Sequence, residues 1–278
     1  MVIYPTYQMN GERAMNSAKI FIDPAKCRKD GICVKICPCQ IFKPGKSGVP
    51  EVEAGLVSTC IKCGHCVSAC PGDAITVTAL DAADFKPGID KLPEFEVFEN
   101  LVMSRRSIRS FKSEPVKIEL LQKLLDMTRY CPTAKNTQSL SWLIVNGHEK
   151  VRKVAADVIN IFRPIERMAP LVAAFDNGED PVCRNAPQLL VAYGSEKYAW
   201  GNLDAAIAIA NLELAAKTSG LGTCWGGFVT NAAASDKQIG KNLGLDDSEK
   251  IFAALMIGYP KYAYRKVPPR NALRLKVV

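Results

Sequence analysis

The sequence predicts an α+β protein of two domains, a small cysteine-rich domain followed by a larger one that mixes helices and strands. Three observations support this fold class. Eight of the eleven cysteines lie between Cys27 and Cys70. Residues 1–98 carry 11 Lys and Arg against 11 Asp and Glu, so the net charge of +8 comes entirely from residues 99–278. In that second part, apolar residues recur at helical spacing or form short runs typical of buried strands.

The domain boundaries follow from changes in composition along the chain. Residues 1–17 are polar and have no apolar stretch of signal-peptide type, so we expect an N-terminal extension of a cytoplasmic protein. The first domain spans residues 18–80, and the second spans residues 99–278. Residues 81–98 contain Pro87, Gly88 and Pro93 without sustained periodicity, which indicates a linker. No run of about 18 uncharged apolar residues occurs, so no membrane-spanning helix is expected.

The cysteine cluster of the first domain contains the run Cys60-x2-Cys63-x2-Cys66-x3-Cys70-Pro71. Such a run binds a cubane iron–sulfur cluster through three cysteines, and its fourth cysteine ligates a second cluster. Structural zinc is the alternative, but zinc sites favour paired C-x2-C knuckles. The run instead has a third cysteine, Cys66, in the same C-x2-C spacing, and a fourth, Cys70, followed by proline. Both features favour an iron–sulfur cluster over zinc.

An earlier copy of the run has an aspartate in place of one cysteine. Overlaying residues 27–38 on residues 60–71 puts Asp30 opposite Cys63. One cluster would then have Cys27, Cys33, Cys70 and either Asp30 or no fourth ligand. The other would have Cys37, Cys60, Cys63 and Cys66. Because a carboxylate is a harder ligand than a thiolate, we expect an Asp-ligated [4Fe-4S] cluster that can lose one iron to become [3Fe-4S].

Two alternatives remain open for the residues around these ligands. Asp30 could point to solvent, which would leave that cluster permanently three-iron. Cys39 follows Pro38 too closely to replace the missing ligand, so we interpret it as a non-ligand. Short strands are expected at residues 19–22 and 74–77, one on each side of the repeat. Over residues 18–80 the chain resembles the bacterial two-cluster ferredoxins.

The second domain contains clear helix and strand patterns. Apolar residues at helical spacing predict a helix over residues 116–130, and buried strands are expected at residues 142–145, 188–193 and 251–257. Residues 203–218 predict a helix that is apolar almost all round, with Gly220 as its C-terminal cap. A helix without a polar face needs cover on every side, which suggests that it lies in a dimer core.

Four segments of the second domain carry a family resemblance. They are residues 104–111 (SRRSIRSF), 132–138 (PTAKNTQ) followed by Trp142, 220–228 (GLGTCWGGF), and 257–260 (IGYP) followed by Arg265, Lys266 and Arg270. In this order they resemble the nitroreductase family, whose members hold FMN at a homodimer interface. Together with the ferredoxin-like domain, the whole chain is similar to the ferredoxin-fused nitroreductases of anaerobes.

The resemblance implies a set of FMN contacts. Arg105 and Ser107 would face the phosphate and ribityl chain, Arg106 and Arg109 would lie close to the ring or the phosphate, and Lys266 and Arg270 would return to the phosphate. In the segment that begins with Pro132 and Thr133, Asn136 would contact the edge of the flavin ring, with Gln138 behind it. The backbone at Gly226 and Gly227 would pass near the flavin N5. The residue chemistry agrees, because guanidinium groups form forked hydrogen bonds to a phosphate dianion. The alternatives are a solvated helix start for the arginine run and a turn-forming role for Asn136.

The function expected from both domains is an FMN-dependent oxidoreductase that receives electrons through its own clusters. Its substrate would be a small planar electrophile such as a nitroaromatic or a quinone, and its electron donor would be reduced ferredoxin, flavodoxin or NAD(P)H. An electron-transfer or redox-sensing module without a small substrate is one alternative, and a reductive dehalogenase on the same scaffold is another. We expect no nucleic-acid partner, because no basic stripe is interleaved with aromatic residues. Phe162, Met168 and Phe175 are expected to line the substrate pocket.

Overall fold

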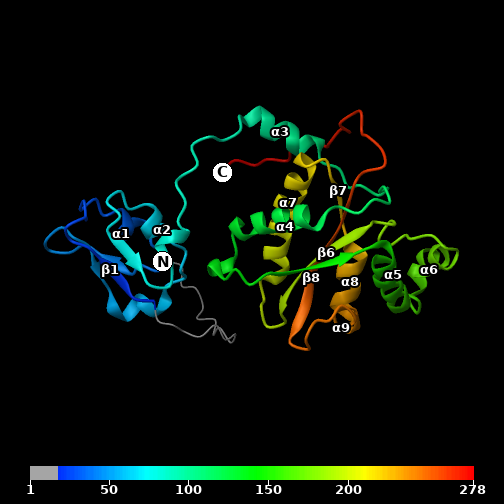
Figure 1. The fold of residues 1–278 in the computed structure, drawn as a ribbon, viewed down its shortest axis with the longest axis horizontal. Helices are drawn as coiled ribbons and strands as arrows, with labels where there is room; N and C mark the ends of the chain where they lie inside the picture. The colour runs from blue at the N-terminus through cyan, green and yellow to red at the C-terminus, as the bar shows by residue number, and fades with distance from the viewer. Residues whose placement is uncertain (1–17) are drawn as a thin grey trace. The chain divides into compact units, whose positions relative to one another are not determined.

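The computed structural model describes residues 18–278, and the predicted extension at residues 1–17 lies outside them. The chain divides into two compact units (Figure 1). The first contains residues 18–92 together with Thr133–Thr137, and the second contains Pro93–Pro132 and Gln138–Val278. The helix α3 (Phe95–Ser104), which belongs to the second unit, begins inside the linker expected at residues 81–98.

The first unit is a small internal repeat around two short helices, α1 (Ile32–Ile36) and α2 (His65–Ser68). The strands β1 (Ile20–Ile22) and β4 (Ile75–Val77) pair antiparallel, so the two strands expected from the sequence are confirmed. A second pair joins β2 (Phe42–Lys43) to β3 (Glu51–Val52), and the 3-10 helices η1 (Ala54–Thr59) and η2 (Ala82–Asp84) complete the unit. The core is small: its fully hydrophobic members are Ala18, Ile20, Ile41, Phe42, Ile75 and Val77.

The second unit is built on an antiparallel sheet with the strand order β5-β6-β8-β7. The bounds are Ser141–Asn146 for β5, Gln188–Ser195 for β6, Gly222–Trp225 for β7 and Glu249–Gly258 for β8. The three strands predicted from apolar runs are therefore confirmed. The central strands β6 and β8 are buried along most of their length, which explains why their sequences lack the polar alternation of a half-exposed strand.

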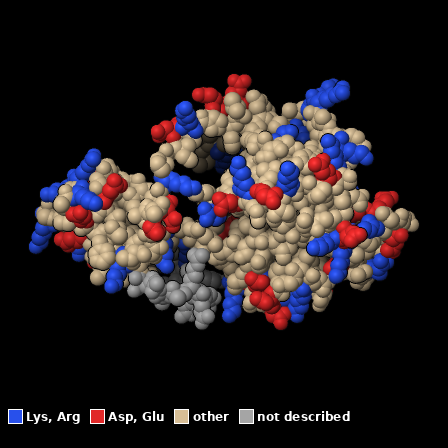
Figure 2. Space-filling view, in the orientation of Figure 1, with Lys and Arg blue, Asp and Glu red and all other residues tan. Residues whose placement is uncertain are grey.

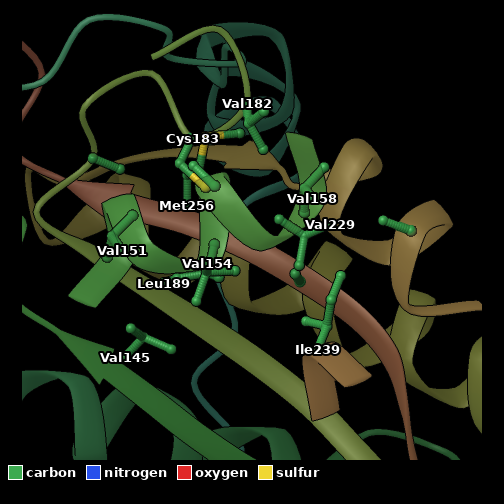
Figure 3. Packing of buried hydrophobic residues seen from close by; sticks show 14 of the residues in the cluster. Val145, Val151, Val154, Val158, Val182, Cys183, Leu189, Val229, Ile239 and Met256 are labelled. Carbon is green, nitrogen blue, oxygen red and sulfur yellow. The ribbon is translucent and has the colours of Figure 1, made fainter. Parts of the chain in front are cut away.

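Helices cover both faces of this sheet. The side chains of Leu189 and Val191 pack on one face with α5 (His148–Phe162), α6 (Ala169–Asp176), α8 (Gly227–Ser235) and α9 (Gln238–Asn242). The neighbouring Leu190 and Ala192 pack on the other face with α4 (Ile118–Met127) and α7 (Gly201–Thr218). Figure 3 shows side chains of the first of these cores, among them valines of α5 together with Leu189 and Met256 of the sheet.

The helices predicted in this unit form with small changes at their ends. The helix expected over residues 116–130 is α4 followed by the 3-10 helix η3 (Thr128–Tyr130). The helix expected over residues 203–218 is α7, and Gly220 follows it with φ of 73° while Leu221 N donates to Ala216 O at 2.9 Å. Left-handed backbone of this kind after a helix favours glycine, as predicted.

Charged residues of both signs are mixed over the surface. On the face in view in Figure 2, Lys and Arg alternate with Asp and Glu among the described residues. None of the helices in the described part of the chain combines the length and hydrophobicity needed to cross a lipid bilayer.

Candidate functional site

The two cysteine runs fold into matching loops. Lys29 (φ 60°) and Gly31 (φ 68°) of the first run adopt left-handed backbone, and so do Lys62 (φ 54°) and Gly64 (φ 73°) of the second. Such angles are uncommon outside glycine, so their recurrence at equivalent positions shows that the loops are structural copies. The overlay that sets Asp30 opposite Cys63 therefore holds in three dimensions.

Each loop borders its own cavity. One cavity is lined among other residues by Cys27, Asp30, Cys33 and Cys70. The other is lined by Cys37, Cys60, Cys63 and Cys66 among others. Cys37 and Cys70 thus each lie at the cavity of the other run, as expected from the sequence. We call these cavity I and cavity II.

The spacing of these ligands differs from that of a single-ion site. Among residues 18–278, no three His, Cys, Asp or Glu side chains are placed to hold one metal ion. In a cubane each thiolate binds a different iron, so four ligands around a cavity need not converge on one point. Burial raises the pKa of the Cys66 thiol to about 11, so iron bound there would have to displace a proton.

Asp30 lies at the start of α1 as well as at cavity I. One of its carboxylate oxygens, Oδ1, accepts a hydrogen bond from Ile32 N at 2.9 Å. This bond orients the side chain beside Cys27 and Cys33. A carboxylate has a second oxygen that can bind a metal, so the local structure is compatible with a role for Asp30 as an iron ligand.

Cys39 is a fifth thiol at cavity II. Its Sγ donates a hydrogen bond to Thr59 O at 3.1 Å, and burial raises the pKa of the thiol. A protonated thiol bound to a backbone carbonyl is the state expected of a cysteine that does not bind iron.

The segment Thr133–Thr137 around Asn136 is part of the first unit. Lys135, Asn136 and Gln138 all have positive φ, between 48° and 53°, which is a strained stretch of backbone for residues other than glycine. Asn136 Nδ2 donates to Ile61 O and to Lys62 O, each at 3.1 Å. Both carbonyls belong to the loop between Cys60 and Cys63, which lines cavity II. The Asn136 side chain, which was predicted at the flavin ring edge, therefore supports this loop through two hydrogen bonds.

The arginine run of the second unit lies along β7. Ser107 forms a parallel β-bridge with Thr223, and Ile108 N donates to Thr223 O at 2.8 Å. A Cβ atom on Gly222 would stand 2.5 Å from Ile108 Cγ1, so only glycine permits this approach. The structure thus brings residues 105–109 beside the strand that leads to Gly226 and Gly227.

The two glycines have different surroundings. Gly226 N donates to Ala254 O at 2.8 Å, and a Cβ atom at Gly226 would stand 3.1 Å from both Ala254 Cβ and Ala254 O. At Gly227, where α8 begins, an added Cβ would make only an ordinary contact with the Trp225 side chain. A side chain at position 226 would therefore press against Ala254, whereas position 227 tolerates one.

Two charged residues at this site were not found from the sequence. The carboxylate of Glu213 on α7 lies 3.5 Å from Arg105 Nη1 and accepts a hydrogen bond from Thr223 Oγ1 at 3.0 Å. Arg184, in the loop before β6, adds its positive charge to those of Arg109 and Arg105 near the buried Cys224 thiol. Neither residue belongs to a motif. Both lie far from residues 105–109 in the sequence and approach them only in the folded chain.

The remaining predicted contacts lie at less constrained positions. Residues 261–278 are exposed and follow the last strand without regular structure, and they carry Lys266 and Arg270. Pro132 and Gln138 belong to the second unit and flank Thr133–Thr137, which belong to the first. Phe162, expected in the substrate pocket, is instead 5% exposed and stacks edge-to-face on Phe228 in the core of the second unit. The helical spacing of α5 directs its side chain inward.

Comparison with known families and proteins agrees with both parts of the chain. The nitroreductase family model matches residues 102–259, and a 4Fe-4S dicluster domain model matches residues 19–71. The putative NAD(P)H nitroreductase YfhC of Bacillus subtilis is 26% identical over 195 residues, covering 68% of this chain and 96% of that protein. The 4-nitrobenzoate reductase of Pseudomonas putida is 25% identical over 199 residues, covering 58% and 85% of the two chains.

Solved structures share the fold of the second unit. A nitroreductase with bound FMN from Bacteroides fragilis superposes with a TM-score of 0.58 and 22% identity, covering 66% of this chain and all of that one. A nitroreductase with bound FMN from Desulfitobacterium hafniense gives a TM-score of 0.55 and 21% identity, covering 65% and 97%. The resemblance drawn from four short segments is thereby confirmed over most of the second unit. The chain belongs to the nitroreductase family of oxidoreductases and carries a 4Fe-4S dicluster domain before its nitroreductase domain.

Proposed function

We propose that this protein is an FMN-dependent reductase that receives electrons through two iron–sulfur clusters of its own and reduces a small planar electrophile, such as a nitroaromatic or a quinone. The observation that carries the proposal is the placement of the arginine run along β7, directly before the close-packed Gly226. The 4Fe-4S dicluster match and the two cysteine-lined cavities support an attached source of electrons for this site.

The residues of the second unit fit FMN. Arg106 Nε is buried and has no hydrogen-bond partner among the described residues, which is costly unless a ligand supplies an acceptor. Arg105, Arg109 and Arg184 gather positive charge near Cys224, as a phosphate dianion requires. FMN, when bound, takes up electrons one at a time and delivers them in pairs. Arg105 and Ser107 would hold its phosphate, and the bare backbone at Gly226 would let the ring lie close.

The cluster ligands follow from the two cavities. Cys37, Cys60, Cys63 and Cys66 would hold a [4Fe-4S] cluster in cavity II. Cys27, Cys33, Cys70 and Asp30 would hold a [4Fe-4S] cluster in cavity I that interconverts with [3Fe-4S]. All eleven cysteines are free in the structure, which suits a reducing compartment such as the cytoplasm.

A second copy of the chain would complete the FMN site. Leu203 on α7 is 53% exposed and Phe95 on α3 is 77% exposed, and the C-terminal segment adds Tyr262 and Leu273 to the exposed apolar residues. Large apolar side chains on neighbouring elements are typical of a dimer interface. In the homodimer, Lys266 and Arg270 of that segment would reach the phosphate.

The first test is the cofactor content and reactivity of protein purified without oxygen. We expect about seven to eight irons and one FMN per chain, because one cluster can lose an iron. The reduced protein should reoxidise faster when nitroaromatics or quinones are added. Reoxidation that no member of such a panel accelerates would instead favour an electron-transfer or redox-sensing module, and release of halide from halogenated rings would indicate a dehalogenase. Protein without flavin would contradict the proposal altogether.

Replacing Asp30 by cysteine tests the ligands of cavity I. The change restores the soft ligand that cavity II has at the equivalent position, so we expect a stable [4Fe-4S] cluster and loss of the three-iron electron paramagnetic resonance signal after mild oxidation. Asp30→Asn serves as the control, because it keeps an oxygen that can accept the hydrogen bond from Ile32 N. A spectrum unchanged in both variants would indicate that Asp30 never binds iron.

A further inference from the structure

We infer that Glu213 is a positioning residue of the flavin phosphate site, which fixes the Arg105 guanidinium from helix α7. The inference rests on the proposed FMN site and adds a residue that belongs to none of the motifs of the chain. Glu213 is negatively charged and contacts one of the arginines that would bind the phosphate, although a negative charge there is expected to repel the phosphate.

The geometry joins three elements at one oxygen. Glu213 Oε1 accepts a hydrogen bond from Thr223 Oγ1 at 3.0 Å and lies 3.5 Å from Arg105 Nη1. Thr223 is only 2% exposed and lies in β7, and the Glu213 side chain is 16% exposed. Because the hydroxyl of a buried strand residue holds the carboxylate, Glu213 is itself fixed before it contacts Arg105.

A fixed carboxylate can orient an arginine and still leave N–H donors of that arginine for the phosphate. A guanidinium has five N–H donors, so contact with Glu213 through Nη1 leaves donors directed elsewhere. Long arginine side chains lose considerable conformational entropy when they are ordered. If Glu213 orders Arg105 in the free protein, that cost is not added when the phosphate binds.

Two other roles for Glu213 make different predictions. If the carboxylate only repels the phosphate, removing it should tighten FMN binding. If Glu213 only ties α7 to β7, removing it should weaken the binding of every flavin equally. A positioning role through Arg105 predicts weaker binding that is confined to flavins bearing a phosphate.

The experiment compares FMN with riboflavin, which lacks the phosphate. Dissociation constants are measured on flavin-free full-length protein from the quenching of flavin fluorescence, for the wild type, Glu213→Ala and Glu213→Gln. We expect the alanine variant to bind FMN about two- to tenfold more weakly, as for the cost of ordering one long side chain on binding, and to bind riboflavin like the wild type. The glutamine variant keeps an acceptor for Thr223 and should lose less. Glu149→Ala, which removes an exposed glutamate on α5 of the same unit, is the matched control and should change neither constant.

A double-mutant cycle supplies an independent measurement. In an Arg105→Ala background, Glu213→Ala should have no further effect on FMN binding, because the group that it positions is gone. Tighter FMN binding by Glu213→Ala, an equal loss for both flavins, or additive losses in the cycle would each overturn the inference. A wild type that binds neither flavin would overturn the proposed function itself, and the inference with it.

Discussion

Replacing Cys63 by alanine should remove at least about one iron per chain, as in a cluster with three thiolates, and greatly slow turnover with reduced ferredoxin as the donor. Cys63 lines cavity II with Cys37, Cys60 and Cys66, so its loss leaves one iron of the cubane without a thiolate. The measurement is iron and sulfide content together with anaerobic turnover. Flavin reduced directly by light in the same variant should still react with the substrate, because the second unit is unchanged.

The matched control for this prediction is Cys39→Ala. Cys39 lines the same cavity, but its thiol donates to Thr59 O, so both clusters and turnover with ferredoxin should persist. Loss of iron in this variant would mean that Cys39 is a ligand. Full turnover in Cys63→Ala would mean that electrons reach the flavin without the cluster in cavity II.

Replacing Gly222 by alanine should destabilise the second unit by about 1–3 kcal/mol, as for overpacking of a well-packed core, and should weaken FMN binding. The new Cβ would stand 2.5 Å from Ile108 Cγ1 and 3.0 Å from Ile108 Cβ. To relieve that clash, residues 105–109 must move away from β7. This movement displaces the predicted phosphate ligands, because they lie in the same segment. Thermal unfolding and FMN titration measure the two effects.

A compensating change makes this second prediction specific. Ile108→Ala alone removes core volume and should cost about 2–5 kcal/mol. In the double variant the alanine at 222 occupies space that the isoleucine has vacated, so the combined loss should be smaller than the sum of the single losses. Additive losses would indicate that Gly222 is needed for its backbone conformation and not for the approach of Ile108.

The two cysteine loops of the first unit could be predicted, because the spacing of cluster ligands constrains the local backbone, whereas the β2–β3 pair was not expected. The cysteine positions imply tight loops, and the loops imply the crossing of Cys37 and Cys70 between cavities that the structure displays. Strands β6 and β8 were equally clear, since continuous apolar runs such as that from Leu189 to Ala192 fit the interior of a sheet that is covered on both faces.

Other parts of the fold depend on contacts that no local pattern records. The strand β7 has only four residues and begins at Gly222. The glycines around it favour a turn, so the sequence pattern does not indicate a strand there. Phe162 follows the helical spacing of α5 into the core, although its apolar character alone also fitted a pocket lining. Glu213 and Arg184 join the arginine run from distant parts of the chain, and a single sequence contains no signal for such an encounter.

The exchange of cysteines between the two cavities has a consequence for biogenesis. Cavity I has three of its four candidate ligands once Cys33 has been synthesised, yet it must wait for Cys70, while cavity II is complete at Cys66. Both sites therefore become competent for metallation within four residues of each other on the ribosome. The nascent chain presents no complete set of candidate ligands early in translation, so both clusters would be inserted late.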